Sequence, residues 1–255
     1  MKAVILGGTS GMGRALAQRM AERGDHVFLL GIGEIELAKS AADLAARSRI
    51  AAKAESSASA ALATWAVCDL ESPETFGPAL DAADAALGNF DAVVVTAALF
   101  ATQAALEADL ELARRLLTVN YAHTVVFCEH VRQRLLAHGG GSLTVFSSVA
   151  GDRGRKPVGL YGSGKAGLSH YLESLDHKFH DQGLHVLTVK PGFVKTGMTA
   201  GLKPPPFAGE PESVADDVLR AIDRRIAVVY TPRIWSLVML VIRWLPRFIM
   251  RKIGF

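Results

Sequence analysis

The sequence predicts a doubly wound α/β protein, in which a parallel sheet lies between two layers of helices. Short runs rich in Val, Ile and Leu recur along the chain, a helical pattern follows each run, and a glycine-rich turn follows the first. The runs are apolar at consecutive positions, which is typical of strands buried on both faces. They lie at Ala3–Leu6, His26–Leu30, Thr64–Cys68, Ala92–Thr96, Ser142–Phe146, His185–Val189 and Ala227–Tyr230.

Two segments between these runs have distinctive compositions. Residues 38–63 are rich in Ala and Ser, so we expect an exposed helix in the first part and a loop around Ser56–Ser59. Residues 201–211, "GLKPPPFAGEP", contain four prolines and are predicted to be a loop. This loop follows the carboxyl end of a predicted strand, where open α/β sheets bind ligands. It is either a lid over a substrate or a plain connector.

Composition narrows the class of protein. The chain has 255 residues, 50% of them hydrophobic and 21% charged, which is typical of a globular protein with a sizeable core. A net charge of +3 is too small to indicate nucleic-acid binding. Cys68 and Cys128 are the only cysteines, which favours a reducing, cytoplasmic compartment. The chain opens on a strand pattern, so we expect no signal peptide. His177 and His180 are interpreted as a solvated helix face, and we predict no metal site.

The segment Gly7-Gly8-Thr9-Ser10-Gly11-Met12-Gly13 stands between the first predicted strand and a helical pattern that ends at Gly24. A strand, a glycine-rich turn and a helix form the geometry that holds a pyrophosphate at a helix N-terminus. The glycines let the backbone approach the phosphates and let the helix pack on the strand. A glycine-rich turn without a ligand is the alternative.

Tyr161 and Lys165 are four residues apart and share one face of a helix, and Ser148 lies thirteen residues before Tyr161. A phenol has an ordinary pKa of about 10, poorly matched to acid–base chemistry near neutral pH. A fixed ammonium one turn away favours the phenolate, so we expect Lys165 to lower the pKa of Tyr161. The pair alone is also common on helices that have no catalytic role.

Several motifs occur in a fixed order along the chain: Gly7, Gly11 and Gly13, then Asn120, Ser147-Ser148, Tyr161, Lys165 and Pro191-Gly192. Their order and spacing resemble those of the short-chain dehydrogenase/reductase family over nearly the whole chain. The resemblance implies a Rossmann-type fold with about seven parallel strands and helices on both faces. It also implies a nicotinamide cofactor, NAD or NADP, and a homodimer or homotetramer.

The resemblance assigns roles to individual residues. Tyr161 is expected to be the proton donor to a ketone, or the base for an alcohol. Ser148 is expected to hydrogen-bond the substrate oxygen, and Lys165 to hold the nicotinamide ribose. Asn120 resembles the residue that anchors a water in the proton relay. The residues expected to bind the cofactor are Gly7, Thr9, Ser10, Gly11, Met12, Gly13, Asp69, Leu70, Ala97, Ala98, Tyr161, Lys165, Pro191, Gly192, Val194 and Thr196.

The chain departs from the family pattern at two places. After the fourth strand the family usually has Asn-Asn-Ala-Gly, whereas this chain has Val95-Thr96-Ala97-Ala98, so we expect a looser loop there. After the second strand it has Gly31-Ile32-Gly33, with neither the Asp that selects a ribose 2′-hydroxyl nor the Arg that selects a 2′-phosphate. Cofactor preference therefore stays open. Asp69 either meets the adenine edge or caps a helix, and we favour the adenine.

The C-terminal segment, "RIWSLVMLVIRWLPRFIMRK" at residues 233–252, is apolar and carries only basic charges. We divide the chain into a catalytic domain, residues 1–231, and this amphipathic segment, residues 232–255. On one continuous helix Arg243, Arg247 and Arg251 form a single stripe, and Pro246 kinks or restarts it. Trp235 and Trp244 suit a lipid headgroup boundary. We favour a segment lying on the inner face of a membrane over a subunit contact or a lining of the substrate cleft.

The same segment, with "SSVAGDRGRKPVGLYGSGKAGL" and "KPGFVKTGMTAGLK", resembles the decaprenylphosphoryl-2-keto-ribose reductases within the family. This resemblance implies a lipid-linked keto-sugar as substrate and an enzyme that works at a membrane surface. Arg153, Arg155 and Lys156 then either meet a phosphodiester or belong to a solvated loop. The alternatives are a keto-lipid reductase, such as a 3-ketosphingoid or 3-ketoacyl reductase, a reductase of a small soluble ketone, and a non-enzymatic nicotinamide-binding protein.

Overall fold

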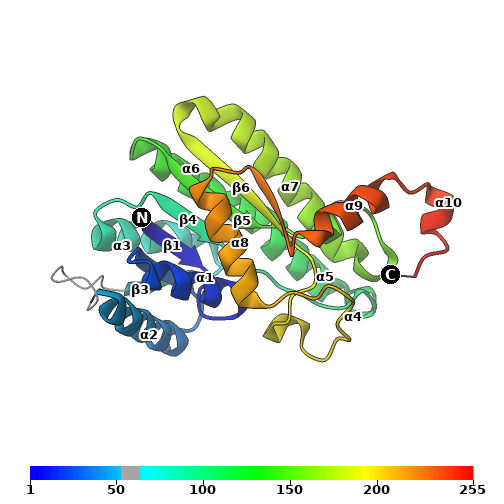
Figure 1. The fold of residues 1–255 in the computed structure, drawn as a ribbon, viewed down its shortest axis with the longest axis horizontal. Coiled ribbons are helices and arrows are strands. Elements are labelled where there is room, and N and C mark those ends of the chain that lie inside the picture. Colours follow the sequence, from blue (N-terminus) through cyan, green and yellow to red (C-terminus); the bar gives the residue numbers. More distant parts are fainter. Residues whose placement is uncertain (53–63, 255) are drawn as a thin grey trace.

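A parallel sheet runs through the middle of the molecule, and helices cover both of its faces (Figure 1). The computed structural model describes residues 1–52 and 64–254. All seven predicted strands are present, and their bounds differ from the predicted ones by one or two residues. They are β1 (Lys2–Leu6), β2 (His26–Gly31), β3 (Thr64–Val67), β4 (Ala92–Val95), β5 (Gly141–Phe146), β6 (Leu184–Pro191) and β7 (Val228–Thr231).

The strand order is β3-β2-β1-β4-β5-β6-β7, and every neighbouring pair is parallel. The chain runs from β1 outward to β3 and then crosses back to place β4 beside β1. The strand order therefore reverses between β1 and β4. In open α/β sheets the crevice at such a reversal, beyond the carboxyl ends of the strands, is where ligands bind.

The helices connect successive strands, and the predicted helix in the Ala-rich segment is confirmed as part of α2. The loop predicted around Ser56–Ser59 lies outside the described residues. The main helices are α1 (Gly11–Glu22), α2 (Glu34–Ala52), α3 (Phe76–Leu87), α4 (Gln103–Ala108), α5 (Leu110–Leu117), α6 (Thr124–Ala137), α7 (Gly159–Phe179), α8 (Pro211–Asp223), α9 (Ile234–Trp244) and α10 (Arg247–Met250).

Alternate residues of each strand face opposite helix layers. Val4 and Leu6 of β1 pack in one core cluster with residues of α3, α6 and α7. Ala3 and Ile5 of the same strand pack in a second cluster with residues of α1, α2 and α8. Both faces of the sheet are thus buried, which explains why the strands are apolar at every position.

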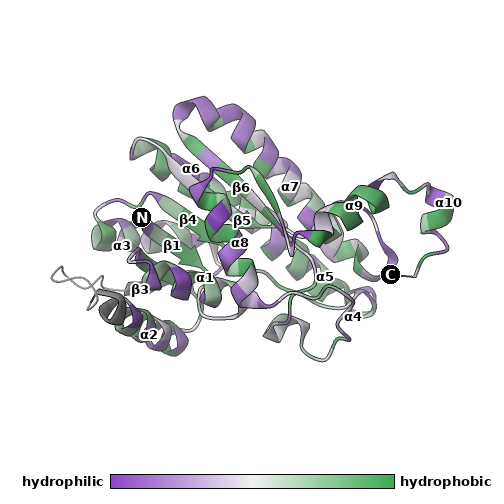
Figure 2. Ribbon diagram, viewed as in Figure 1, coloured by the Kyte–Doolittle hydropathy of each residue, from purple (hydrophilic) through white to green (hydrophobic). Residues whose placement is uncertain are grey.

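The C-terminal segment forms two short helices at one end of the molecule, and α9 is hydrophobic around most of its surface (Figure 2). The helix ends at Trp244, and the chain restarts as α10 after Pro246. The restart predicted at Pro246 is confirmed, and the stripe on one continuous helix is wrong for Arg243, because the extended backbone at Leu245 and Pro246 separates it from Arg247 and Arg251. Among residues 1–52 and 64–254, no helix is both long and apolar enough to span a bilayer.

Candidate active site

The glycine-rich turn after β1 forms one wall of a cleft at the carboxyl edge of the sheet. Gly7 has a φ of +91°, and a Cβ there would lie 2.7 Å from the amide nitrogen of Ala97. Ser10 is the N-cap of α1, but its side chain makes no capping hydrogen bond. The first amides of α1 have no acceptor within the helix. A pyrophosphate is the kind of group that such a helix start binds.

This cleft has a volume of about 420 Å³, a size typical of small-ligand sites. Residues from four strand ends line it, as expected where the strand order reverses. Cys68, Val119 and Met198 also line the cleft, although the sequence analysis did not assign them to it. The predicted cofactor-binding residues that line it are Gly7, Thr9, Ser10, Gly11, Met12, Gly13, Asp69, Leu70, Ala97, Ala98 and Thr196. The lining thus fits part of a nicotinamide dinucleotide, whereas the other residues predicted to bind it do not line this cleft: Tyr161, Lys165, Pro191, Gly192 and Val194.

The segment after β4 is held firmly, contrary to the expectation of a looser loop. The Thr96 hydroxyl lies 3.0 Å from the carbonyl oxygen of Leu6 and 3.1 Å from that of Gly7. It donates to this pair of carbonyls at the end of β1, and the amides of Thr96 and Ala97 both donate to Leu6. A threonine therefore ties the β4 loop to the glycine-rich turn where the family pattern has an asparagine.

Asp69 lines the cleft and also caps a turn. One of its carboxylate oxygens accepts a 2.8 Å hydrogen bond from the amide of Glu71, while its own amide donates to the Thr75 hydroxyl. The Ser72 side chain makes no capping bond. The capping interpretation thus has support for one oxygen, and contact of Asp69 with an adenine stays a prediction.

Ser148, Tyr161 and Lys165 come together where β5 meets α7. Ser148 follows β5 and its hydroxyl accepts a 3.1 Å hydrogen bond from the amide of Ala150. A Cβ at Gly162 would lie 2.7 Å from the carbonyl oxygen of Ala150, so only a glycine lets α7 approach this turn so closely. The Lys165 ammonium donates a 2.8 Å hydrogen bond to the carbonyl oxygen of Phe146 and lies 5.9 Å from the centroid of the Tyr161 ring.

Burial has the largest effect on the pKa values of Tyr161 and Lys165. It raises the pKa of Tyr161 to about 12, and a hydrogen bond with Ser148 offsets part of that rise. Burial also lowers the pKa of Lys165 to about 8. The expectation that Lys165 lowers the phenol pKa is therefore wrong for this structure, because removing both groups from water favours their neutral forms.

Asn120 lies in a π-helical turn, Thr118–His123, between α5 and α6. Its side-chain oxygen accepts from the Leu99 amide at 2.7 Å, and its side-chain nitrogen donates to the Leu99 carbonyl at the same distance. These bonds fix the loop after β4 to the turn between α5 and α6. The predicted anchoring of a water by Asn120 stays a prediction.

Gly192 lies against Trp235, a residue that we expected at a lipid headgroup boundary. A Cβ at Gly192 would lie 2.1 Å from the indole nitrogen of Trp235, which donates a 3.3 Å hydrogen bond to the Phe207 carbonyl oxygen. Trp235 thus packs between this turn and the proline-rich loop and is only half-buried, and its place at a headgroup boundary stays a prediction. The periodicity of an apolar helix does not reveal which of its faces is covered.

The C-terminal segment also contacts the loop that joins Ser148 to Tyr161. Met239 and Ile242 of α9 are buried against Val149, the neighbour of Ser148. Arg153 donates a 2.9 Å hydrogen bond to the Leu245 carbonyl, and Lys156 donates a 2.6 Å hydrogen bond to the Arg251 carbonyl. The segment is therefore packed beside the catalytic residues.

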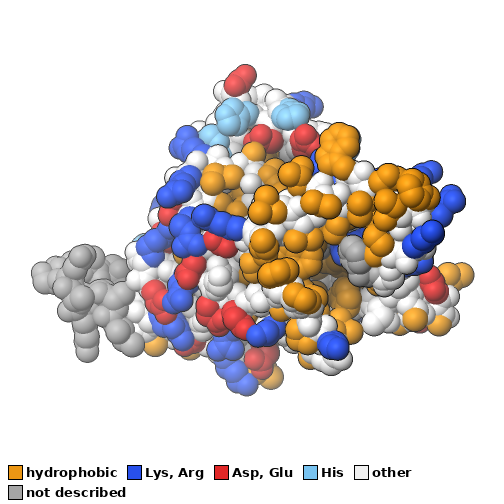
Figure 3. Space-filling view, turned by 45° about the vertical axis from the view of Figure 1, so that its right-hand side comes forward, with side chains coloured by type: hydrophobic (Ala, Val, Ile, Leu, Met, Phe, Trp, Pro, Cys, Tyr) orange, Lys and Arg blue, Asp and Glu red, His pale blue; other side chains and the backbone are white. Residues whose placement is uncertain are grey.

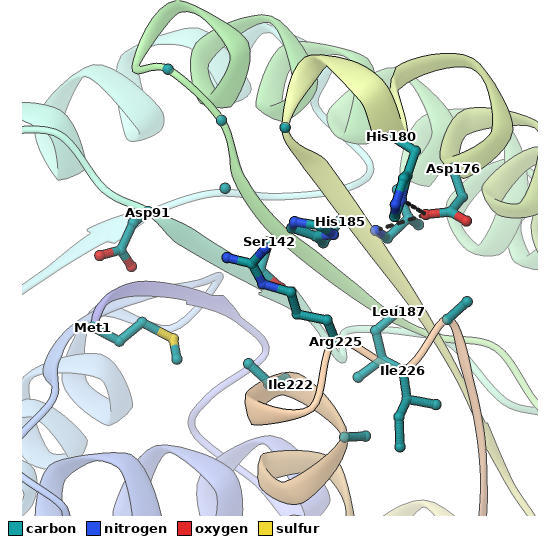
Figure 4. Close-up of a pocket in the computed structure, with 17 residues that line it drawn as sticks. Met1, Asp91, Ser142, Asp176, His180, His185, Leu187, Ile222, Arg225 and Ile226 are labelled. Carbon is teal, nitrogen blue, oxygen red and sulfur yellow. Dashed lines mark hydrogen bonds and ion pairs between the residues drawn. The ribbon is translucent and has the colours of Figure 1, made fainter.

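A second cavity of about 490 Å³ lies at the opposite, amino edge of the sheet (Figure 4). His185 and Arg225 approach each other within it, and the rings of His180 and His185 are 5.2 Å apart. Burial lowers the pKa of His185, and Arg225 and His180 lower it further. The cavity is lined by the first residues of β5, such as Ser142, whereas Ser148 follows the other end of that strand. It is thus separate from the catalytic group.

Comparisons with known proteins identify the relatives of this chain. The family profile described as short chain dehydrogenase matches residues 1–206. An uncharacterised oxidoreductase from Mycobacterium tuberculosis is 34% identical over 251 residues, covering 98% of this chain and 95% of that protein. Carbonyl reductase family member 4 from Xenopus tropicalis is 29% identical over 223 residues, covering 84% of this chain and 88% of its own.

Solved structures share the fold. A short-chain type dehydrogenase/reductase from Mycobacterium ulcerans superposes with a TM-score of 0.78 at 22% identity, covering 90% of this chain and 87% of its own. An actinorhodin polyketide ketoreductase solved with NADPH superposes with a TM-score of 0.76, also at 22% identity, covering 90% and 94%. The family match over residues 1–206 and the relative that is 34% identical establish that the chain belongs to the short-chain dehydrogenase/reductase family and is an NAD(P)-dependent oxidoreductase acting on carbonyl or alcohol groups.

Proposed function

We propose that this enzyme reduces a ketone and that Ser148, Tyr161 and Lys165 are its catalytic residues. The nicotinamide cofactor, NADH or NADPH, supplies the hydride to the carbonyl carbon. Tyr161 supplies the proton to the carbonyl oxygen, and the Ser148 hydroxyl hydrogen-bonds the same oxygen. Lys165 binds the nicotinamide ribose and supplies a positive charge beside the phenol. The observation that carries this proposal is the convergence of these three side chains where β5 meets α7, at the edge of the sheet that bears the dinucleotide cleft.

The protonation states of the site suit a reductase. With a pKa of about 12, Tyr161 holds its proton at neutral pH and is available as a donor. With a pKa of about 8, Lys165 is mostly cationic at neutral pH and stabilises the negative charge that develops on the oxygens. Positioned general acids of this kind contribute about 10²- to 10⁴-fold to reaction rates. We assign Asn120 a supporting role in the proton relay, and its two hydrogen bonds to the Leu99 backbone hold it at the loop after β4.

We further propose that residues 232–255 form a membrane-surface segment attached to the catalytic domain, residues 1–231. The side of α9 that faces away from the body exposes large apolar side chains, and Trp244 is 81% exposed. Phe248 of α10 and Phe207 of the proline-rich loop are also exposed, and Figure 3 shows hydrophobic side chains gathered on this side of the molecule. Arg247, Arg251 and Lys252 are exposed beside it. Apolar side chains with a basic rim suit an anionic bilayer surface.

A membrane-surface enzyme whose catalytic loop touches this segment is suited to a lipid-linked ketone. The resemblance to decaprenylphosphoryl-2-keto-ribose reductases supports a polyprenylphosphoryl 2-keto-pentose as the substrate. A polyprenyl chain stays in the bilayer, so the reacting ketone must be met at its surface, on the inner face if the enzyme is cytoplasmic. A keto-lipid such as a 3-ketosphingoid base or a 3-ketoacyl group fits the same surface and is the second candidate.

A cofactor-oxidation assay against a panel of ketones tests this proposal. The panel holds polyprenylphosphoryl keto-pentoses, 3-ketosphingoid and 3-ketoacyl compounds, and small soluble ketones. We expect the highest kcat/KM with the lipid-linked keto-sugar, and co-sedimentation of the protein with vesicles that contain phosphatidylglycerol. Preference for a small soluble ketone, together with no vesicle binding, contradicts the lipid-linked assignment and favours a C-terminal segment that only packs between subunits.

A further inference from the structure

The loop between Ser148 and Tyr161 carries three basic side chains with different surroundings. Arg153 and Lys156 donate to main-chain carbonyls of the C-terminal segment, Leu245 and Arg251. These two cations therefore hold the segment in place. Arg155 lies between them in the sequence, and within the described residues its buried Nε has no hydrogen-bond partner. A buried donor without an acceptor costs free energy, so this atom requires explanation.

The carboxylate of Asp152, three residues before Arg155, does not supply the missing acceptor. The Asp152 side chain is only 3% exposed, and its two oxygens already accept from Lys190 at 2.6 Å and from the Tyr230 hydroxyl at 2.7 Å. Asp152 still attracts Arg155 through space, but burial outweighs that attraction and lowers the pKa of the guanidinium. Among the residues that the structure describes, the Nε of Arg155 is thus a buried donor without a protein acceptor, on a side chain that is only half-buried.

The local charge is unbalanced as well. Within residues 1–52 and 64–254, Asp152 is the carboxylate that interacts with Lys190 and Arg155, and Arg243 lies near its partner Tyr230. Arg243 of α9 lies close enough to the Tyr230 hydroxyl for its charge to act on the pKa of that hydroxyl. The group sits directly beside the catalytic residues, because a Cβ at Gly151 would lie 2.7 Å from the backbone of Lys165. A positive excess next to a catalytic loop suits an anionic part of the substrate.

We propose that Arg155 binds an anionic phosphate ester of the substrate, with Lys190 and Arg243 adding to the positive field. The guanidinium is suited to phosphate because its planar donors match two phosphate oxygens at once. The inference that this phosphate ester belongs to the substrate rests on the proposed function, the reduction of a phosphate-bearing ketone. It adds the residue that distinguishes such a substrate from a neutral keto-lipid.

The test measures binding of decyl phosphate and of 1-decanol, below their aggregation limits, to the protein saturated with NADH. We expect the wild-type protein to bind decyl phosphate at least tenfold more tightly than 1-decanol. Arg155→Gln should reduce this preference to less than threefold, and Arg155→Lys should restore part of it. Arg153→Gln removes the same charge from the same loop and should keep the preference. Unchanged NADH affinity and melting temperature show that the variants fold.

Retention of the tenfold preference by Arg155→Gln overturns the inference. Vesicles of phosphatidylglycerol separate the two sources of phosphate: if Arg155→Gln weakens vesicle binding and leaves decyl phosphate binding intact, Arg155 contacts a lipid headgroup and the substrate role is wrong. Ketone reduction is measured in parallel. A wild-type protein that reduces no ketone, yet shows the Arg155-dependent preference, contradicts the proposed function and not this site.

Discussion

Replacement of Gly13 by alanine tests whether the turn after β1 is shaped for a dinucleotide. A Cβ at Gly13 would lie 2.3 Å from the carbonyl oxygen of Gly7 and 2.4 Å from the hydroxyl of Thr96, whereas ordinary contacts begin near 3.4 Å. Relief of this overlap requires a shift of about 1 Å between α1 and the turn, and overpacking of this kind costs ~1–3 kcal/mol. When this cost destabilises the conformation of the turn that binds NADH, the affinity for NADH drops between about fivefold and about 150-fold.

The assay is a fluorescence titration of NADH, with thermal unfolding measured on the same samples. Gly197→Ala is the matched control, because Gly197 lines the same cleft and a Cβ there has no atom within 4 Å. We expect Gly197→Ala to bind NADH like the wild-type protein. Wild-type affinity in Gly13→Ala would refute the assignment of this turn to the cofactor.

Three further outcomes follow from the site. Lys165 has a pKa of about 8, so it loses its positive charge as the pH rises through about 8, and kcat/KM for ketone reduction should fall over the same range. The residual activity of Lys165→Met should not show this fall in kcat/KM. Among the described residues, Asp69 and Glu71 are the only charged residues that line the cleft, and both are acidic. They repel the added phosphate of NADPH, so kcat/KM with NADH should be at least about tenfold higher than with NADPH. Trp235→Ala should destabilise the protein by ~2 kcal/mol, because a partly buried aromatic contact is lost. Trp244→Ala should change stability by less than ~0.5 kcal/mol and should weaken vesicle binding. Denaturant unfolding measures the stability changes, and co-sedimentation measures vesicle binding.

The fold could be predicted from sequence because both faces of the sheet are buried. A strand such as β4, with four consecutive buried residues, gives an apolar run that alternating strands do not have. The glycine-rich turn and its helix were also predictable, since backbone geometry restricts which residues occupy them. Gly7, with its positive φ, and Gly13, which has no room for a Cβ, are the two clearest cases.

Contacts between distant segments were not predictable. Thr96 replaces the expected asparagine, and only the structure shows that its hydroxyl reaches the carbonyls of Leu6 and Gly7. Trp235 lies on a helix that is apolar on most sides, so periodicity does not distinguish its covered face from its exposed one. The spacing of Tyr161 and Lys165 correctly placed them on one helix, but the degree of burial that sets their pKa values depends on the whole fold.

Tyr161→Phe tests the central assignment most directly, because it removes one hydroxyl and keeps the ring. NADH affinity and the rate of ketone reduction are measured on the same preparation, with the best ketone from the substrate panel. We expect NADH to bind as tightly as in the wild-type protein and the reduction rate to fall about 10²- to 10⁴-fold. Reduction at the wild-type rate by Tyr161→Phe would show that another group delivers the proton.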